Sequence, residues 1–455
     1  MKTQLFVFFI FLIGLSACED FLKIDPPKHE LSTPTVFTSD AIAEAAMRGV
    51  YSELTTSLFA NGLGSSITAL GDYMADQLYS TSALYDPYSD NMILPDHEFI
   101  GQNWSGLYKI IYQANSVLEG LASSTLISAA KMEQLEGEAR FIRAFCYFYL
   151  VNLWGDVPLV LTTDYRVNSS IARASLDLVY DQIEMDLVRA QQLLGDDYSI
   201  SGGGRTRANR SVATALLARM YLYREQWVKA EVEATKVIEH AAYALVNLNQ
   251  VFLKNNTEAI WQYYPTQNLP FNTREAILFL PPNASLPPSV LLTPELLAVF
   301  ELGDLRATSW VNTITRNGVP YTHVNKYKVR SGATSYLEYS TIFRLAEQHL
   351  IRAEARAHQE KLTEATSDVN IIRARAGLAA TLATTRSEIL DAIIQERRVE
   401  FFGEWGHRWF DLVRTDRAGS ALGTLKPDWQ EEDSVWPVPL RELQANPSMT
   451  QNPGY

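Results

Sequence analysis

The sequence predicts a mainly α-helical fold in which helical hairpins stack as a solenoid, with long irregular loops and a few short strands between them. Two observations predict this class. Apolar side chains recur every three or four residues through much of the middle and late chain, and one helical hairpin has a similar partner 135 residues further on. Segments rich in Gly, Pro, Asn and Tyr separate the periodic stretches, with strand-like runs such as EAIWQYY at 258–264 and AILFL at 276–280.

Periodic apolar residues mark the individual helices. Residues 134–156 carry one apolar stripe, which is formed by Phe141, Phe145, Phe148 and Val151. The stripe predicts a buried helix that ends near Gly155. This helix is expected over about 135–153, and other helices are predicted near residues 104–121, 175–195 and 386–402.

A helical hairpin is repeated within the chain. Residues 211–240 are predicted to be a helix pair with a turn near Glu225, and residues 350–375 resemble them at an offset of 135, as Ala218 matches Ala353. The offset is close to four units of about 34 residues, the period of tetratricopeptide hairpins. We therefore expect about four degenerate tetratricopeptide-like hairpins stacked as a right-handed solenoid. The alternative is that two alanine-rich amphipathic hairpins look alike by chance.

The first residues have the layout of an export signal. A lysine follows the initiating methionine, residues 5–13 are an unbroken apolar run, and residues 15–17 supply small side chains for a signal peptidase. The run is shorter than the roughly 20 residues that span a bilayer. Together with Cys18, this segment resembles a bacterial lipobox, in which the cysteine carries acyl chains. We expect a lipoprotein signal peptide over 1–17, lipidation of Cys18 and a membrane-anchored tether over 18–34; the alternative is an ordinary secretory signal with a chance cysteine.

Length, charge and cysteine content narrow the function classes. The 455 residues, 47% of them hydrophobic, can bury a large core, and we expect one folded region over 35–455 with intertwined parts over about 35–225 and 255–455. The formal net charge of −13 argues against nucleic acid as a ligand, because a phosphate backbone requires clustered Lys and Arg. After lipidation of Cys18 only Cys146 remains, so we expect no internal disulfide, no cysteine-ligated metal, and a buried Cys146.

Motifs for catalysis are missing from the sequence. We find no HExxH, no GxSxG, no P-loop and no dinucleotide-binding glycine pattern. Residues 395–414 place His407 among carboxylates and arginines, which fits either an acid–base site or a core helix whose charges are paired at its edge, and we favour the core helix. Carboxylate pairs such as Asp72 with Asp76 could serve glycoside hydrolysis, but acidic residues are common on surfaces. We therefore expect no enzyme activity and no cofactor.

Five sequence blocks together resemble one known family. They are CEDFLKIDPP, NWSGLYKIIYQANSVLEGL, EARFIRAFCYFYLVNLWGDVPLV, IIQERRVEFFGEWGHRWFDLVR and WPVPLRELQANPSMTQNPGY. In this order they resemble the SusD/RagB family, the surface glycan-binding lipoproteins of Bacteroidetes nutrient-uptake systems. The resemblance implies a surface-exposed, outer-membrane protein that captures oligosaccharides and acts as a lid over a SusC-like TonB-dependent transporter. It does not identify the glycan, because the loops of this family vary with the ligand.

The ligand is expected at the irregular segments 61–103 and 255–340. A sugar ring has apolar C–H faces and polar edges, so its site needs flat Tyr or Trp side chains beside hydrogen-bonding groups. Both segments supply them, and the resemblance implies that ligand aromatics come from these two regions. The candidate ligand-binding residues are Tyr79, Tyr85, Asp86, Tyr88, Asp90, Asn91, Tyr264 and Trp310. The alternative for each single aromatic is packing in the core or in a loop.

Two other functions stay open. A helical-repeat protein could bind a peptide or a protein in its concave groove. A surface glycan hydrolase or lyase could use scattered carboxylate pairs. Whichever ligand is bound, the overall acidity of the chain disfavours polyanionic polymers.

Overall fold

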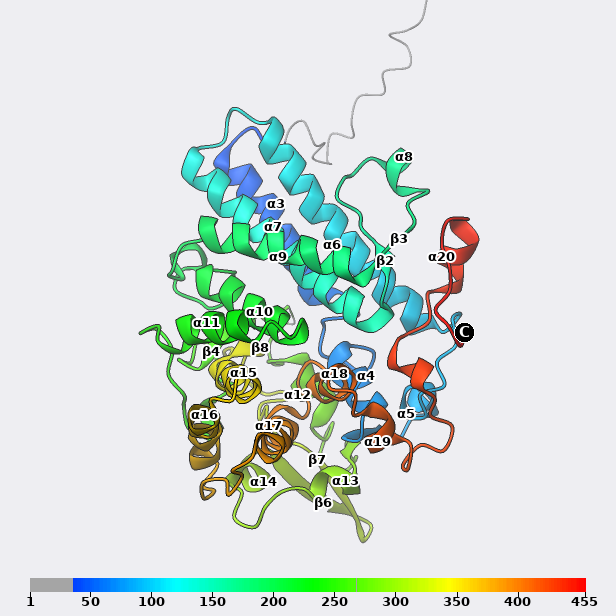
Figure 1. The fold of residues 1–455 in the computed structure, drawn as a ribbon, viewed down its shortest axis with the longest axis vertical. Helices are drawn as coiled ribbons and strands as arrows, with labels where there is room; N and C mark the ends of the chain where they lie inside the picture. Colours follow the sequence, from blue (N-terminus) through cyan, green and yellow to red (C-terminus); the bar gives the residue numbers. More distant parts are fainter. Residues whose placement is uncertain (1–35, 267) are drawn as a thin grey trace, which may run out of the picture.

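The long helices pack against one another largely in chain order, and this stack is the frame of the molecule (Figure 1). The structure is a computed structural model that describes residues 36–266 and 268–455; the expected signal peptide, Cys18 and the tether lie outside the described residues. Helix α3 (Asp40–Thr56) packs against α6 (Glu98–Ser123) and α7 (Ala129–Trp154). The stack continues through α9 (Leu176–Leu193), α10 (Arg210–Tyr223), α11 (Trp227–Ile238), α15 (Leu345–His358), α16 (Leu362–Arg375) and α17 (Arg386–Phe401). The predicted mainly α-helical class is confirmed.

Helix α7 is buried within the stack because of its apolar stripe. Phe141 and Phe145 are fully buried, and they meet the ring of Trp261 edge to face with centroids 5.0 and 5.2 Å away. The helix ends at Trp154, where Gly155 takes a φ of +68°. Glycine adopts this conformation without the steric cost of a side chain. The predicted helix end near Gly155 is confirmed.

The two similar hairpins begin and turn at equivalent positions. Helices α10 and α15 start at Arg210 and Leu345, and α11 and α16 start at Trp227 and Leu362. Both pairs of helix starts are 135 residues apart, as the repeat predicts. The turn of each hairpin contains one glutamate in the left-handed region, with φ values of +55° and +61°. Helix α11 packs against α15, which joins the two hairpins; the number of four hairpins and the handedness of the solenoid stay predictions.

The strands form short antiparallel ladders, each of two strands among the described residues. The ladders are β1 (Leu78–Ser80) with β5 (Val290–Leu292), β2 (Val157–Pro158) with β3 (Arg173–Ala174), β4 (Ala259–Tyr263) with β8 (Ser340–Arg344), and β6 (Val311–Arg316) with β7 (Val319–Val324). Strand β4 confirms the strand-like run at 258–264. The strand prediction at 276–280 is wrong, because Thr273 caps a helix there by accepting a hydrogen bond from the Ala276 amide at 3.1 Å.

Short helices fill the remaining segments. Helix α4 (Ile67–Met74) packs against α18 (His407–Arg414), so an early segment of the chain lies beside a late one. The others are α5 (Asp86–Ser89), α8 (Tyr165–Asn168), α12 (Arg274–Phe279), α13 (Pro294–Leu297), α14 (Leu305–Ser309), α19 (Ala418–Leu422) and α20 (Leu440–Ala445), with 3₁₀ turns at Ala83–Tyr85, Ser199–Ser201, Leu248–Gln250 and Glu431–Ser434.

Two segments in which a tryptophan is followed closely by proline, residues 154–158 and 436–439, join the N-terminal helices to the end of the chain. Trp154 and Trp436 are fully buried and meet edge to face at 5.0 Å. The Trp154 indole donates to the carbonyl of Pro437 at 2.9 Å. Cys146 is buried, as expected, and within the described part of the chain no helix combines the length and the apolar character needed to cross a membrane. The division into two intertwined parts stays a prediction.

Candidate ligand-binding site

A cavity of about 230 Å³ opens beside β1, where the two irregular segments of the chain meet. Pairing of β1 with β5 places Tyr79 opposite Leu291, and the amide of Thr293 donates to the carbonyl of Gln77 at 2.9 Å. The loop that follows α19 forms another wall. We call this cavity the tyrosine pocket. Its lining residues are Tyr73, Ala75, Asp76, Leu78, Tyr79, Ser89, Asp90, Thr293, Glu295, Leu425, Lys426, Pro427 and Asp428.

Two tyrosines with different environments line the pocket. Strand alternation buries Leu78 and turns Tyr79 outward, so that 40% of the Tyr79 side chain is exposed. Tyr73, at the end of α4, is 1% exposed, and burial raises the pKa of its hydroxyl above the ordinary value. The Tyr73 hydroxyl is buried near the side chain of Ser80, so Tyr73 helps to form the wall of the pocket while Tyr79 presents its ring to the opening.

The floor of the pocket is a buried ion cluster. Asp76 accepts hydrogen bonds from Arg408 at 2.9 and 3.0 Å and from Arg398 at 2.8 Å. Burial alone would raise the pKa of Asp76, but the hydrogen bonds and charges of the two arginines outweigh it and hold the pKa below the ordinary value. Asp76 is therefore ionised at neutral pH and positions the wall from which Tyr79 projects.

Lys426 ties the loop after α19 to the opposite wall. Its ammonium donates to the carbonyl of Tyr73 at 3.0 Å, to the carbonyl of Met74, and to the side-chain oxygen of Asn91 at 2.5 Å. Burial lowers the pKa of Lys426 to about 7, and the nearby carboxylates of Asp76 and Asp90 offset this only in part. No sequence motif surrounds Lys426, and the loop after α19 lies outside both predicted ligand segments. That this loop lines the pocket was therefore not predicted from the sequence.

Two of the predicted ligand residues, Tyr79 and Asp90, line the tyrosine pocket. Tyr85 does not line the pocket; its side chain is half-buried, with the ring centroid 5.3 Å from that of Tyr73. Asp86 is exposed at the start of α5 and does not line the pocket. The structure thus brings together only part of the predicted group.

Three predicted ligand residues are buried, and their burial corrects the prediction. Tyr88 has no exposed surface, and its hydroxyl lies 3.3 Å from Nδ1 of His97. Asn91 is 2% exposed and occupies a left-handed turn with a φ of +58°. Trp310 has no exposed surface and donates from its indole to the carbonyl of Leu248 at 3.0 Å. These side chains pack the loops and present no face to a ligand.

Tyr264 is exposed but belongs to another part of the surface. Its side chain is 58% exposed, and its ring lies 6.1 and 5.7 Å from the rings of Tyr336 and Tyr339. It lines a cavity of about 360 Å³ against α3, together with Tyr51 and Arg207. No residue lines both this cavity and the tyrosine pocket, so the structure separates Tyr264 from Tyr79.

The histidine region at 395–414 is a buried network of paired charges. Arg397 donates to Asp411 at 2.7 Å. His407 is 5% exposed, and burial, followed by the charge of Arg219, lowers its pKa well below the ordinary value. A neutral and enclosed imidazole fits the interpretation of this region as a core helix. The paired charges of Arg397 and Asp411, however, lie in the interior and not at the edge of the helix, where they were expected. Among the described residues, no group of three or more His, Cys, Asp or Glu is placed to hold a metal ion.

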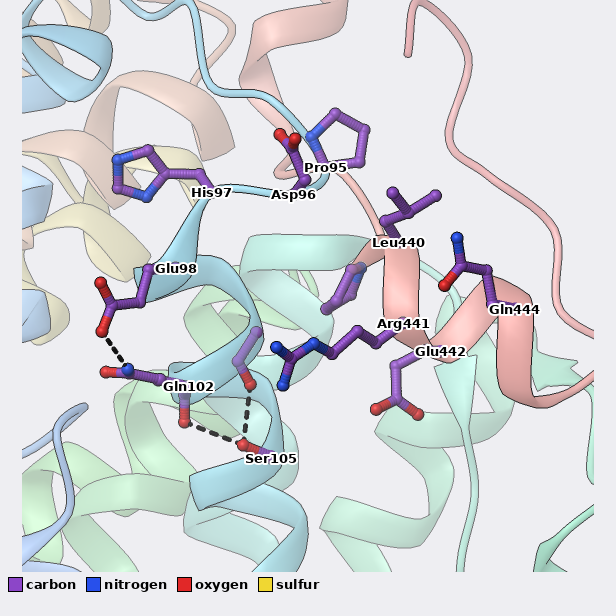
Figure 2. Close-up of a pocket in the computed structure, with 12 residues that line it drawn as sticks. Pro95, Asp96, His97, Glu98, Gln102, Ser105, Leu440, Arg441, Glu442 and Gln444 are labelled. Carbon is purple, nitrogen blue, oxygen red and sulfur yellow. Dashed lines mark hydrogen bonds between the residues drawn. The ribbon is translucent and has the colours of Figure 1, made fainter.

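A larger cavity, of about 680 Å³, lies between the start of α6 and α20 (Figure 2). We call it the α6–α20 groove. Figure 2 shows Glu98 and Gln102 on α6, joined by a hydrogen bond of 2.5 Å, with Arg441 of α20 reaching toward this helix. Its lining residues are Pro95, Asp96, His97, Glu98, Gly101, Gln102, Ser105, Pro439, Leu440, Arg441, Glu442 and Gln444. No Tyr, Trp or Phe is among them, so the groove lacks the flat apolar surface on which a sugar ring stacks.

Comparison with known proteins identifies the family. Residues 20–222 match a family model described as starch-binding, associating with the outer membrane, and residues 305–455 match the model of the SusD family. A SusD-like protein of Formosa agariphila is 25% identical over the whole of both chains. A SusD superfamily protein of Parabacteroides distasonis shares the fold with a TM-score of 0.80 at 24% identity, covering 94% of this chain and all of that one. A laminarin-binding SusD-like protein does so with a TM-score of 0.77 at 24% identity, covering 91% and 99%. The two family matches together span most of the sequence, and the chain belongs to the SusD/RagB family.

Proposed function

We propose that this protein is a cell-surface lipoprotein that binds oligosaccharides in the tyrosine pocket. The observation that carries the proposal is the exposed ring of Tyr79 in the same cavity as the carboxylate of Asp90, at the junction of two loops. A sugar ring can stack a C–H face on Tyr79 while its hydroxyls donate to Asp90 and Asp428.

Relatives support a glycan as the ligand. One of the matching family models is described as starch-binding, and one structural neighbour is named as laminarin-binding. We propose binding without cleavage. Glycoside hydrolysis requires an acid and a carboxylate that both reach the sugar. Burial raises the pKa of Asp72 to about 8, but Asp72 has no exposed surface and does not line the pocket, and the carboxylate of Asp76 is held by two arginines.

Uptake of the captured ligand requires a partner that transports it through the outer membrane, because a lipid-tethered domain cannot itself move a ligand across a bilayer. The proposed partner is a SusC-like TonB-dependent transporter of the outer membrane, over which this protein closes as a hinged lid by rigid-body motion. Acyl chains on Cys18 hold the protein to the outer membrane on the outside of the cell. Tethering beside the transporter raises the effective concentration of captured ligand, so modest affinity is sufficient.

Affinity measurements on the full chain in detergent test the binding function. Wild type is expected to bind at least one member of a polysaccharide panel that includes laminarin and starch. Tyr79→Ala is expected to weaken that binding about tenfold, because the stacking surface is lost. Tyr112→Ala is the matched control, since Tyr112 is 51% exposed on α6 and does not line the pocket. Equal affinity of both variants and wild type would remove the tyrosine pocket from the site.

Three further measurements test the anchoring and the delivery. Mass spectrometry of the native protein should find Cys18 acylated, and whole-cell labelling should reach the folded domain from outside. Purification from native membranes should recover a TonB-dependent barrel with the protein. An unmodified Cys18, or a protein shielded from external label, contradicts the proposed location. Retention of peptides in place of glycans would favour a peptide-binding helical-repeat protein.

A further inference from the structure

The rim of the tyrosine pocket carries three carboxylates, of which Asp90 lies near the charge of Lys426 and Glu295 near that of Arg398. Asp90 and Asp428 are exposed and Glu295 is half-buried. None of the three forms an ion pair within the part of the chain that the structure describes. They come from the end of α5, from α13 and from the loop after α19, so three separate segments place negative charge around one opening.

The cations close to the pocket are already engaged. Arg398 and Arg408 donate to Asp76 at 2.8 and 2.9 Å. The ammonium of Lys426 donates to the carbonyl of Tyr73 at 3.0 Å and to two further oxygens. An anionic group entering the pocket would therefore meet the rim carboxylates without a free ammonium or guanidinium to receive it.

The same carboxylates suit an uncharged sugar. Hydroxyl groups of a neutral glycan are hydrogen-bond donors, and a hydrogen bond to a carboxylate is about twice as strong as one between neutral groups. The arrangement therefore favours neutral hydroxyl donors over anionic groups.

We propose that the tyrosine pocket selects uncharged oligosaccharides and rejects glycans that carry uronate or sulfate groups, an inference that rests on the proposed glycan-binding function. The exposed ring of Tyr79 supplies stacking for any sugar. The rim of Asp90, Glu295 and Asp428 then decides between sugars by charge, since like charges brought together in a partly desolvated site repel strongly.

Binding of neutral and anionic ligands of equal chain length tests the selection. The full chain is measured in detergent at low salt against oligosaccharides of laminarin and of starch, and against oligogalacturonate and a sulfated galactan oligosaccharide. We expect the affinity for the better neutral ligand to exceed the affinity for either anionic ligand by at least about tenfold. The gap should narrow as salt is added, because exposed charges are screened.

A variant without rim charge makes the test specific. The triple substitution Asp90→Asn, Glu295→Gln and Asp428→Asn preserves side-chain shape, and it should raise affinity for the anionic ligands about tenfold while lowering affinity for the neutral ligand. Asp181→Asn, which removes an exposed carboxylate from α9, is the control and should change neither affinity.

Two results would overturn the selection. One is equal affinity of wild type for neutral and anionic ligands, and the other is an unchanged affinity ratio in a folded triple variant. If wild type binds no glycan of either kind, the proposed function itself fails and the selection falls with it. The two failures are therefore distinguishable.

Discussion

The tyrosine pocket and the α6–α20 groove differ in both size and lining. The groove encloses about 680 Å³ and the pocket about 230 Å³. The groove is lined mostly by polar and charged side chains, with two prolines and one leucine. The pocket is lined in part by two tyrosines, of which Tyr79 is exposed and Tyr73 is buried. The chemistry of the lining, and not the volume, therefore identifies a surface on which a sugar ring can stack.

The two cavities also differ in what supports them. In the pocket, Asp76 receives hydrogen bonds from Arg398 and Arg408, and Asp72, one turn earlier, accepts from the amide of Gly403 at 2.6 Å. These contacts join α4 and the residues after it to the segment that includes α17 and α18. Support of this kind holds the walls of the pocket in place before a ligand arrives, which lowers the entropic cost of binding.

Asp76→Ala has the largest expected effect, a loss of stability caused by removing the support of the tyrosine pocket. The substitution leaves Arg398 and Arg408 mostly buried without their carboxylate, and breaking a buried pair on one side costs about 3–5 kcal/mol in the free energy of unfolding. Urea denaturation of the full chain measures the loss. Asp96→Ala, which removes an exposed carboxylate from the groove, is the control and should stay within about 0.5 kcal/mol of wild type. Similar losses in both variants would show that the pocket has no special support.

Asp72→Asn should change how stability depends on pH. Asp72 has no exposed surface, and burial raises its pKa to about 8, whereas an unfolded aspartate titrates near 3.9. Between about pH 4 and pH 8 the folded state keeps a proton that the unfolded state has lost, so wild-type stability falls as pH rises, by up to about 1.4 kcal/mol per pH unit. Asparagine cannot titrate and removes this slope.

Denaturation at pH 5 and at pH 7 checks the Asp72 prediction. Wild type should lose roughly 2–3 kcal/mol more than Asp72→Asn over this interval. Ser105→Ala, in the groove, should leave the wild-type pH dependence as it is, because Ser105 is exposed and its hydroxyl does not titrate in this interval. Parallel pH curves for wild type and Asp72→Asn would mean that Asp72 is ionised in the folded protein.

The helices and the repeat were predictable because their signal is local. Phe141 and Phe145 recur at helical spacing within a few residues of each other, and both are fully buried in α7. The offset of 135 residues was visible in the sequence because each hairpin carries its own small and apolar residues, and the helix starts obey the same offset. A short window of sequence is enough for both observations.

The site was predictable only in part, because irregular segments have no period. Tyr79 and Tyr88 come from one tyrosine-rich stretch, yet 40% of Tyr79 and none of Tyr88 is exposed. Pairing of β1 with β5 separates them, as does packing of Tyr88 against Trp436, whose ring centroid lies 5.9 Å away. Lys426 lies outside both predicted ligand segments, and its contacts with Tyr73 and Asn91 span more than 300 positions in the sequence. Contacts this distant leave no local pattern.

Arg441→Ala has the smallest expected effect and is the most direct test of the comparison. Arg441 lines the groove, is exposed, and forms no ion pair with any described residue. Its loss should change the free energy of unfolding by less than about 0.5 kcal/mol and should leave glycan affinity within about twofold of wild type. Calorimetric titration with the ligand used for Tyr79→Ala allows the two variants to be compared directly. A tenfold loss in Arg441→Ala, with none in Tyr79→Ala, would reverse the comparison, because hydrogen bonding from a guanidinium in the larger groove would then hold the sugar in place of stacking on a tyrosine.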